Sequence, residues 1–388
     1  MTAGPVGEVF LQFLRLGLVG FGGPVAHLAL FRRRFVEDLG WLDGRRFAEY
    51  TALAQLLPGP ASSQVAMAIG HGRAGFAGLL AAWLGFVLPA ATVMAAAGVL
   101  ALRLDPEAAR PWLDGLEIAA LAVVVDAWGR MLWPLRDDGR RLALVIAAAV
   151  LAGVLGGTTG QMLALATGAV AGAWLPPRGE EAVPADGGRA RRALPWLGTF
   201  LLLLVLLPLA ARSGGPLAVL ADRFYRAGAL VFGGGHVVLP LLANEVVAPG
   251  LVPEPLFLAG YGLAQAVPGP LVSLAAYLGM VATGGGPAGA LVALVAVYLP
   301  SLLLVAAGLP LLAALRRHRP VVRALAGIEA AVVGLLLAAL LDPVLPRALD
   351  APAGLPLALA ALLAVRVLPV WLLVPASALA ARLAAALS

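Results

Sequence analysis

The chain has 388 residues, of which 61% are hydrophobic and 12% are charged, about half the charged share of a soluble domain. It contains no cysteine, which excludes disulfides and thiolate metal sites, and its four histidines are too scattered for a zinc motif. We therefore expect no metal and no cofactor. The net charge of +6 comes from arginines in short links between apolar runs, which is typical of positive-inside bias rather than of nucleic-acid binding.

Apolar runs of the length that a bilayer requires predict an all-α polytopic membrane protein with about 10 to 13 transmembrane helices. In chain order, the first repeat (1–175) contains apolar segments at 6–30, 47–70, 74–102, 112–134, 142–155 and 160–175. A polar, Pro/Gly-rich linker (176–193) and an extra transmembrane segment (194–216) follow. The second repeat (217–388) has segments at 217–242, 256–282, 286–315, 321–341 and two pieces within 353–387.

The division into repeats depends on one stretch that occurs twice. The run from Arg15 to Pro24 and the later Gln55–Pro60 return as the run from Arg226 to Gly235 and Gln265–Pro270, at an offset within a residue of 211. This indicates an internal duplication. Equivalent links also exchange their basic character: 32–46 carries five arginines and its counterpart 243–257 none, whereas 316–323 is richer in arginine than 103–111. The exchange predicts that the two halves have inverted topology in the membrane.

Glycine and proline in this stretch predict broken helices. Gly22-Gly23-Pro24 and Pro58-Gly59-Pro60 interrupt apolar runs, and Pro60 suits the first position of a new helix. The free N–H groups after it would lie at a positive helix end, which is a ready anion site. Discontinuous helices in inverted repeats are the usual construction of secondary transporter sites. The predicted substrate-binding residues are Gly22, Gly23, Pro58, Gly59, Pro60, Ser62 and Ser63, with Gly233, Gly234, Pro268, Gly269, Pro270 and Ser273 in the second half.

Four polar pairs complete the predicted site. Arg15 and Arg226 each lie seven residues before a break, so they would face the same side as it, and two guanidinium groups would suit a tetrahedral dianion. Gln55 and Gln265 offer neutral hydrogen bonds, and Glu117 and Glu329 are the expected proton carriers or arginine partners.

Each assignment has a structural alternative. The arginines would also be explained by snorkelling to headgroups, the glycines by close helix packing and the two glutamates by an interfacial position. His27 could contact the site, although its counterpart His236 is not the aligned residue. Asp126 and Arg130 could be only a helix ion pair.

With these motifs in place, the sequence resembles the chromate transporter (CHR) family in its two-domain, long-chain form. The resemblance covers nearly the whole chain and is carried by Phe21–His27, Gly40-Trp41, Gln55–Pro60, Ile69-Gly70, Phe232–His236, Pro268–Pro270 and Ala275–Gly279. It implies a bacterial inner-membrane protein that exports chromate and confers chromate resistance, with sulfate as the expected competitor and antiparallel halves. The second half departs from the family pattern with Gly250-Leu251 opposite Gly40-Trp41, and with Ser273 where relatives often carry asparagine.

The resulting hypothesis is a secondary active transporter, not an enzyme, that moves chromate by alternating access. No nucleotide-binding motif is present, so an ion gradient would drive it. The expected partners are chromate or sulfate and membrane lipid, and a homodimer stays open. A transporter of another small anion, with chromate as an adventitious substrate, is the first alternative. An intramembrane enzyme is the remote one, because the only adjacent acidic pair of aspartates, Asp137-Asp138, fits better as a link.

Overall fold

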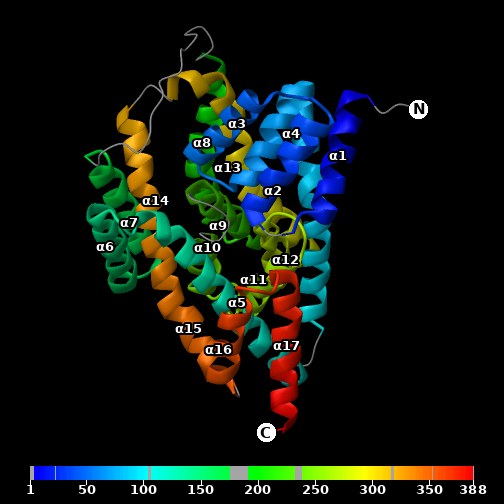
Figure 1. Cartoon of the computed structure of the whole chain (residues 1–388), viewed down its shortest axis with the longest axis vertical. Coiled ribbons are helices and arrows are strands. Elements are labelled where there is room, and N and C mark those ends of the chain that lie inside the picture. The colour runs from blue at the N-terminus through cyan, green and yellow to red at the C-terminus, as the bar shows by residue number, and fades with distance from the viewer. Residues whose placement is uncertain are drawn as a thin grey trace.

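The computed structural model describes residues 4–21, 23–103, 106–174, 191–231, 238–315, 319–351 and 353–387, and it contains only helices and their connections in these ranges (Figure 1). The predicted all-α architecture is confirmed. The helices of the first half are α1 (Pro5–Val19), α2 (Gly23–Phe31), the π-helical η1 (Arg32–Asp38), α3 (Gly44–Leu56), α4 (Ala61–Ala101), α5 (Pro106–Leu132), the 3₁₀ turn η2 (Trp133–Leu135), α6 (Gly139–Leu155) and α7 (Gly157–Gly172).

Helix α8 (Leu194–Ala211) separates these from the second half. The second half consists of α9 (Pro216–Leu230), α10 (Val238–Leu242), the π-helical η5 (Ala243–Val247), α11 (Glu254–Ala266), the 3₁₀ turn η6 (Leu271–Ser273), α12 (Leu274–Val281), α13 (Gly286–Leu315), α14 (Arg319–Ala339), the π-helical η7 (Leu340–Val344), α15 (Leu345–Asp350), α16 (Gly354–Ala364) and α17 (Val370–Leu387).

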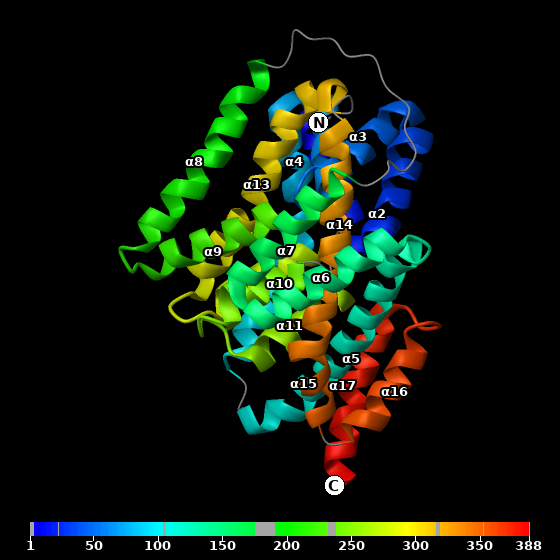
Figure 2. The same ribbon diagram turned by 90° about the vertical axis from the view of Figure 1, so that its left-hand side faces the viewer.

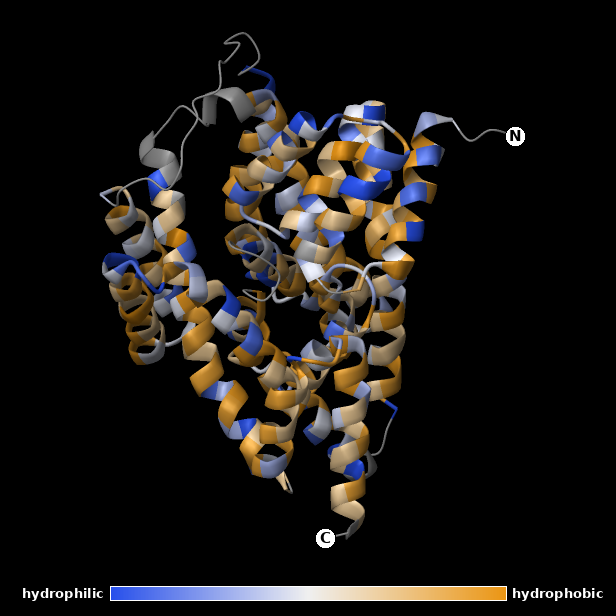
Figure 3. Ribbon diagram, viewed as in Figure 1, coloured by the Kyte–Doolittle hydropathy of each residue, from blue (hydrophilic) through white to orange (hydrophobic). Residues whose placement is uncertain are grey.

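Several of these helices have the length and hydropathy to cross a membrane. The long apolar stretches are Ala61–Ala101, Arg110–Leu135, Arg191–Ala211, Gly286–Leu311 and Ala326–Asp350, and shorter ones occur at Val238–Val247, Leu271–Val281, Gly354–Ala364 and Val370–Ala386. Helix α8 buries none of its side chains and stands at the edge of the molecule (Figure 2). Apolar residues also cover much of the outer helices (Figure 3). A multi-pass membrane protein follows from these features.

The helix breaks lie where glycine and proline predict them. Helix α1 ends at Val19 and α2 begins at Gly23, and four residues separate α3 from α4 around Gly59. The second half repeats this interruption around Gly269, between α11 and η6. The break expected at Gly233 and Gly234 lies outside the described residues.

Helix α4 is itself folded back at one point. Ala74 (φ −144°, ψ 30°) and Gly75 (φ +61°, ψ −152°) are not helical, and a Cβ on Gly70 would collide with the carbonyl oxygen of Gly78. A short half-helix therefore packs closely against a long one, as glycine permits. Helices α12 and α13 repeat this hairpin in the second half.

In each half, one helix packs against the last two helices of the other half. Helix α5 of the first half packs against α16 and α17 of the second, and α14 of the second packs against α6 and α7 of the first (Figure 2). Glycine lies at both contacts: a Cβ on Gly115 would meet Ser377 and Ala378, and one on Gly327 would meet Gly168 and Gly172. Such reciprocal contacts are what a two-fold pseudosymmetry axis between the halves produces.

Candidate functional site

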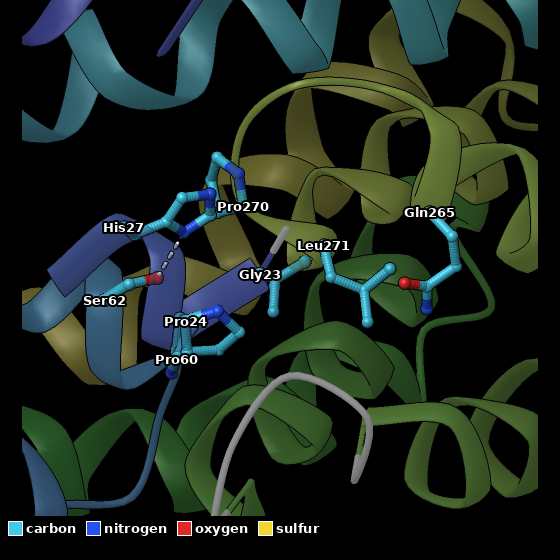
Figure 4. A pocket seen from close by; sticks show the side chains of 9 residues that line it. Gly23, Pro24, His27, Pro60, Ser62, Gln265, Pro270 and Leu271 are labelled. Carbon is cyan, nitrogen blue, oxygen red and sulfur yellow. Dashed lines mark hydrogen bonds between the residues drawn. The ribbon is translucent and has the colours of Figure 1, made fainter. Parts of the chain in front are cut away.

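A pocket lies where the broken helices of the two halves meet (Figure 4). The residues that line it come from α2, the start of α4, the end of α11 and η6: Gly23, Pro24, His27, Pro60 and Ser62 from the first half, and Gln265, Pro270, Leu271 and Val272 from the second. Both Pro-Gly-Pro loops thus contribute to one site. Among the predicted residues, the structure brings Gly23, Pro60, Ser62, Gln265 and Pro270 together here.

Each Pro-Gly-Pro loop is tied to the opposite repeat through its glycine. The backbone N–H of Gly59 donates to the carbonyl of Val231 at 2.5 Å, and that of Gly269 donates to the carbonyl of Gly20 at 2.9 Å. Val231 and Gly20 occupy equivalent positions, directly before the two Phe-Gly-Gly motifs. The two glycines have φ of +131° and +113°, a region that disfavours other residues. These reciprocal hydrogen bonds hold the two loops on either side of the pocket.

The first loop is the more tightly packed of the two. Gln64 Nε2 donates to the carbonyl of Pro58 at 2.6 Å and to Oγ of the fully buried Ser301 at 3.4 Å. A Cβ on Gly59 would collide with Ser301 Oγ and Gln64 Nε2, whereas one on Gly269 would meet only the Ala90 methyl group, at 2.9 Å.

The pocket faces the N-terminal ends of two helical segments. The carbonyl of Pro60 accepts the first hydrogen bond of α4, from the N–H of Gln64 at 3.0 Å, so the N–H groups of Ala61, Ser62 and Ser63 have no partner within the helix. The carbonyl of Pro270 accepts from Ser273 in the same way at 3.0 Å. The residues that line the pocket include no aspartate or glutamate. This environment favours an anion.

His27 is the one titratable side chain among the lining residues. It is 1% exposed, its Nε2 lies 2.8 Å from the carbonyl of Gly20, and its Nδ1 lies 3.2 Å from Ser62 Oγ (Figure 4). The aligned residues of the second half are Val238 and Val272. The sequence left open that His27 contacts the site, and the structure places it in the lining beside Ser62. The contact between the two was not predicted, because it is present in one repeat only.

Ser63 and Ser273 lie behind the pocket rather than on its wall. Both are buried near the hydroxyl of the fully buried Tyr298 on α13, but none of these three hydroxyls makes a hydrogen bond within the described residues. Ser63 and Ser273, predicted to bind substrate, lie at the two half-helix starts, but their side chains are buried in the interior.

The structure does not bring the two predicted arginines to the pocket. Arg226 Nη2 contacts Asp222 at 2.9 Å and Glu245 at 3.0 Å, and both acids are buried. Arg15 is exposed on α1, whose buried face of Val9, Phe13, Leu16 and Gly17 packs on α4. The expected arginine clamp is thus absent from this conformation, because one guanidinium is neutralised and the other points outward.

The other predicted residues also lie outside the pocket. Gln55 is exposed on α3, and Glu329 is exposed on α14. Glu117 is buried on α5, where the charged groups around it include Asp114, Glu254 and Arg347. Pro58 and Pro268 precede the two tied glycines, and Gly22, Gly233 and Gly234 are outside the described residues.

Broken helices from two repeats that meet around one pocket are a construction found in membrane transporters. The family model described as "Chromate transporter" matches residues 7–173 and 218–383. The chain belongs to the chromate transporter family.

Curated relatives agree with this assignment. The chain is 29% identical to a chromate transport protein of Pseudomonas aeruginosa, over 86% of this chain and 80% of the relative. It is 27% identical to a chromate transport protein of Cupriavidus metallidurans, over 90% and 85%, and 26% identical to an uncharacterized transporter of Methanocaldococcus jannaschii, over 85% and 82%. No solved structure matches.

Proposed function

We propose that this protein transports chromate across the bacterial inner membrane, and that the pocket between the two Pro-Gly-Pro loops is its binding site. The observation that carries the proposal is the convergence of both half-helix starts on one pocket without an acidic side chain. Family membership supplies the substrate, since two of the relatives are named as chromate transport proteins.

Chromate would be held mainly by backbone and neutral donors. Residues at the start of α4 and of η6 line the pocket, where their backbone N–H groups would be the donors, and Gln265 also belongs to the lining. Gln265 Nε2 is buried and makes no hydrogen bond of good geometry within the described residues, although the hydroxyl of Tyr261 lies near this side chain. A buried donor without a partner costs about 1–3 kcal/mol, and an oxyanion oxygen would remove that cost.

Transport would follow from alternating access of two inverted halves. The reciprocal ties at Gly59 and Gly269 would act as pivots, because they join the halves directly beside the bound anion. We propose export, which would confer chromate resistance, with an ion gradient as the energy source. Glu117 is the stronger proton-carrier candidate, since it is buried among charged groups, and Glu329 is the weaker.

Sulfate is the second candidate substrate. It shares the tetrahedral shape and double charge of chromate, and the described lining offers hydrogen-bond donors that would serve either ion equally. We therefore expect sulfate to compete.

The test is chromate uptake into everted membrane vesicles from cells that express this chain, with and without an imposed proton gradient and with excess sulfate. Saturable uptake that depends on the gradient and is reduced by sulfate would support the proposal. Uptake no greater than in vesicles without the protein, despite normal insertion, would contradict it.

A further inference from the structure

The His27–Ser62 pair suggests how a proton and an anion could act on one site. We propose that His27 is a proton-linked switch of the oxyanion pocket: protonation of Nδ1 releases the Ser62 hydroxyl to the pocket and places a positive charge on its wall. The inference rests on the proposed function, because it concerns the same pocket.

The two hydrogen bonds of His27 determine which nitrogen can change. A carbonyl oxygen only accepts, so Nε2 carries a hydrogen and donates to Gly20 at 2.8 Å in either protonation state. In the neutral ring Nδ1 is therefore an acceptor, and Ser62 Oγ, 3.2 Å away, donates to it. When the ring is neutral, the single hydrogen of the Ser62 hydroxyl is therefore engaged in the bond to Nδ1 and cannot be donated to an anion.

Protonation reverses this second hydrogen bond without moving either side chain. Nδ1–H would then donate to Ser62 Oγ, and the serine O–H would rotate toward another acceptor. Ser62 lines the pocket, so an anion there would gain one hydroxyl donor and a nearby imidazolium. The bond from Nε2 to Gly20 would also strengthen, since charged donors make stronger hydrogen bonds.

The surroundings of His27 favour protonation of its ring only when an anion is bound nearby. His27 packs against the rings of Phe31 and Phe86, and within the described residues its ring nitrogens contact only Gly20 and Ser62. The charged or titratable residues on the elements beside it are Glu8 and Arg15 of α1, His71 and Arg73 of α4, and Arg32, Arg33, Arg34, Glu37 and Asp38 of η1.

Each acidic group among these residues pairs with an arginine rather than with His27. Glu8 contacts Arg73 at 3.0 Å, Glu37 contacts Arg32 at 3.6 Å and Asp38 contacts Arg34 at 3.4 Å. Residues 267–273 of the opposite repeat contain no titratable side chain. An imidazolium at this place would face the positive end of α4 and only desolvated surroundings, which is unfavourable until an anion arrives. Anion and proton should therefore bind together, and each must raise the affinity for the other by the same factor.

The test is calorimetric binding of sulfate to the purified full-length protein at about pH 6 and about pH 8, on either side of the ordinary histidine range. Sulfate is the probe because it stays a dianion at both values, whereas chromate itself takes up a proton. Two buffers with different heats of ionisation report the number of protons taken up per sulfate. We expect sulfate to bind about tenfold more tightly at the lower pH, within the usual range of coupling between sites, with net proton uptake.

Two variants assign the proton to His27. His27→Gln should abolish the proton uptake and the pH dependence of sulfate affinity, while His71→Gln, a control on α4 outside the pocket, should retain both. Sulfate binding without proton uptake in the wild type would overturn this inference alone, and this measurement needs no variant to fold. Proton uptake that persists in His27→Gln would also overturn it. Absence of sulfate and chromate binding at both pH values would contradict the proposed function as well.

Discussion

In each repeat, a side-chain contact joins the first helix to the helical segment that follows the break. The arginine of this contact lies on the later segment in the first repeat and on the earlier one in the second. In the first repeat, Arg34 Nε and Nη2 both donate to Gln12 Oε1 at 3.0 Å. At the aligned positions the second repeat has Glu245 and Arg223, joined at 3.2 Å. The donor has moved from the later helix to the earlier one, and the helices remain together.

The exchange changes the role of the duplicated arginine. In the second repeat the acid at 245 also accepts from Arg226, which is joined in turn to Asp222. In the first repeat the residue aligned with Asp222 is Leu11, and Arg15 is exposed. The backbone ties at Gly59 and Gly269 are nearly equivalent, but the side chains around them have diverged. A repeated residue therefore indicates a repeated backbone position more reliably than a repeated function.

The largest expected effect comes from removing the arginine in the buried cluster. Arg226→Leu would leave two buried carboxylates without this partner, and breaking a buried pair costs about 3–5 kcal/mol. Arg15→Leu should change the free energy of unfolding by no more than about 0.5 kcal/mol, as at ordinary surface sites. Thermal unfolding of the purified variants measures both, and equal losses would show that the two arginines have the same role.

The two tied glycines should respond unequally to a methyl group. Gly59→Ala would force a Cβ into Ser301 and Gln64, and overpacking of this kind costs about 1–3 kcal/mol. The closest neighbour of the new methyl group in Gly269→Ala is the Ala90 methyl group at 2.9 Å, so we expect this variant to retain more transport. Chromate uptake in vesicles, normalised to inserted protein, measures the difference. Greater damage from Gly269→Ala would contradict the packing described here.

The two candidate proton carriers should also differ. Glu117→Gln removes a buried charge near the Glu254–Arg347 ion pair, whereas Glu329→Gln alters an exposed side chain. We expect the first to reduce gradient-driven chromate uptake about tenfold, the scale of a proton-transfer group, and the second to change it less than the first. Uptake without a gradient is the control. An equal loss in both variants would mean that burial does not decide the coupling.

Of the two aligned glutamines, only Gln265 should have a moderate effect on transport when it is replaced. Gln265→Ala removes a donor from the pocket, so the chromate KM should rise about fivefold to tenfold, or about 1–1.4 kcal/mol, which is within the range of a typical hydrogen bond. Gln55→Ala, at the aligned exposed position, should leave KM nearly unchanged. A larger rise in Gln55→Ala would place the anion elsewhere.

The smallest effect should come from the exchanged contact itself. Gln12→Leu removes the acceptor of Arg34, but Arg34 still reaches Asp38 at 3.4 Å, so the expected loss of stability is about 0.5–1 kcal/mol. Arg223→Leu should cost a similar amount, because Glu245 keeps Arg226. A loss as large as that of Arg226→Leu would show that the cluster depends on every member.

The sequence predicted the broken helices because glycine and proline act locally. Gly23, Pro58 and Pro60 interrupt helices whatever surrounds them, and the loops that contain them were located correctly. The packing of α5 on α16 and α17 was not predictable in this way, since it depends on contacts between residues far apart in the chain. The duplication implied two related halves, but it did not indicate which helices of one half pack against the other.

The site was predicted in part for the same reason. Pro60, Ser62 and Pro270 belong to local motifs, and the structure brings them to the pocket. The position of Arg226 depends on Glu245, 19 residues away, although the i,i+4 spacing of Asp222 and Arg226 was a signal that the arginine had a partner. His27 was named as a possible contact but not among the predicted binding residues, because no histidine occupies the aligned position of the second half.

The central claim, that an oxyanion occupies the pocket between the two repeats, can be tested directly because the chain has no cysteine. The measurement is the rate at which a small thiol reagent labels Leu271→Cys, in the pocket lining, with and without sulfate. Gln55→Cys, exposed and outside the pocket, is the control. If an oxyanion binds in this pocket, sulfate should slow the labelling of Leu271→Cys in a saturable way and leave the labelling of Gln55→Cys unaffected. Labelling of Leu271→Cys at the same rate with and without saturating sulfate would contradict it.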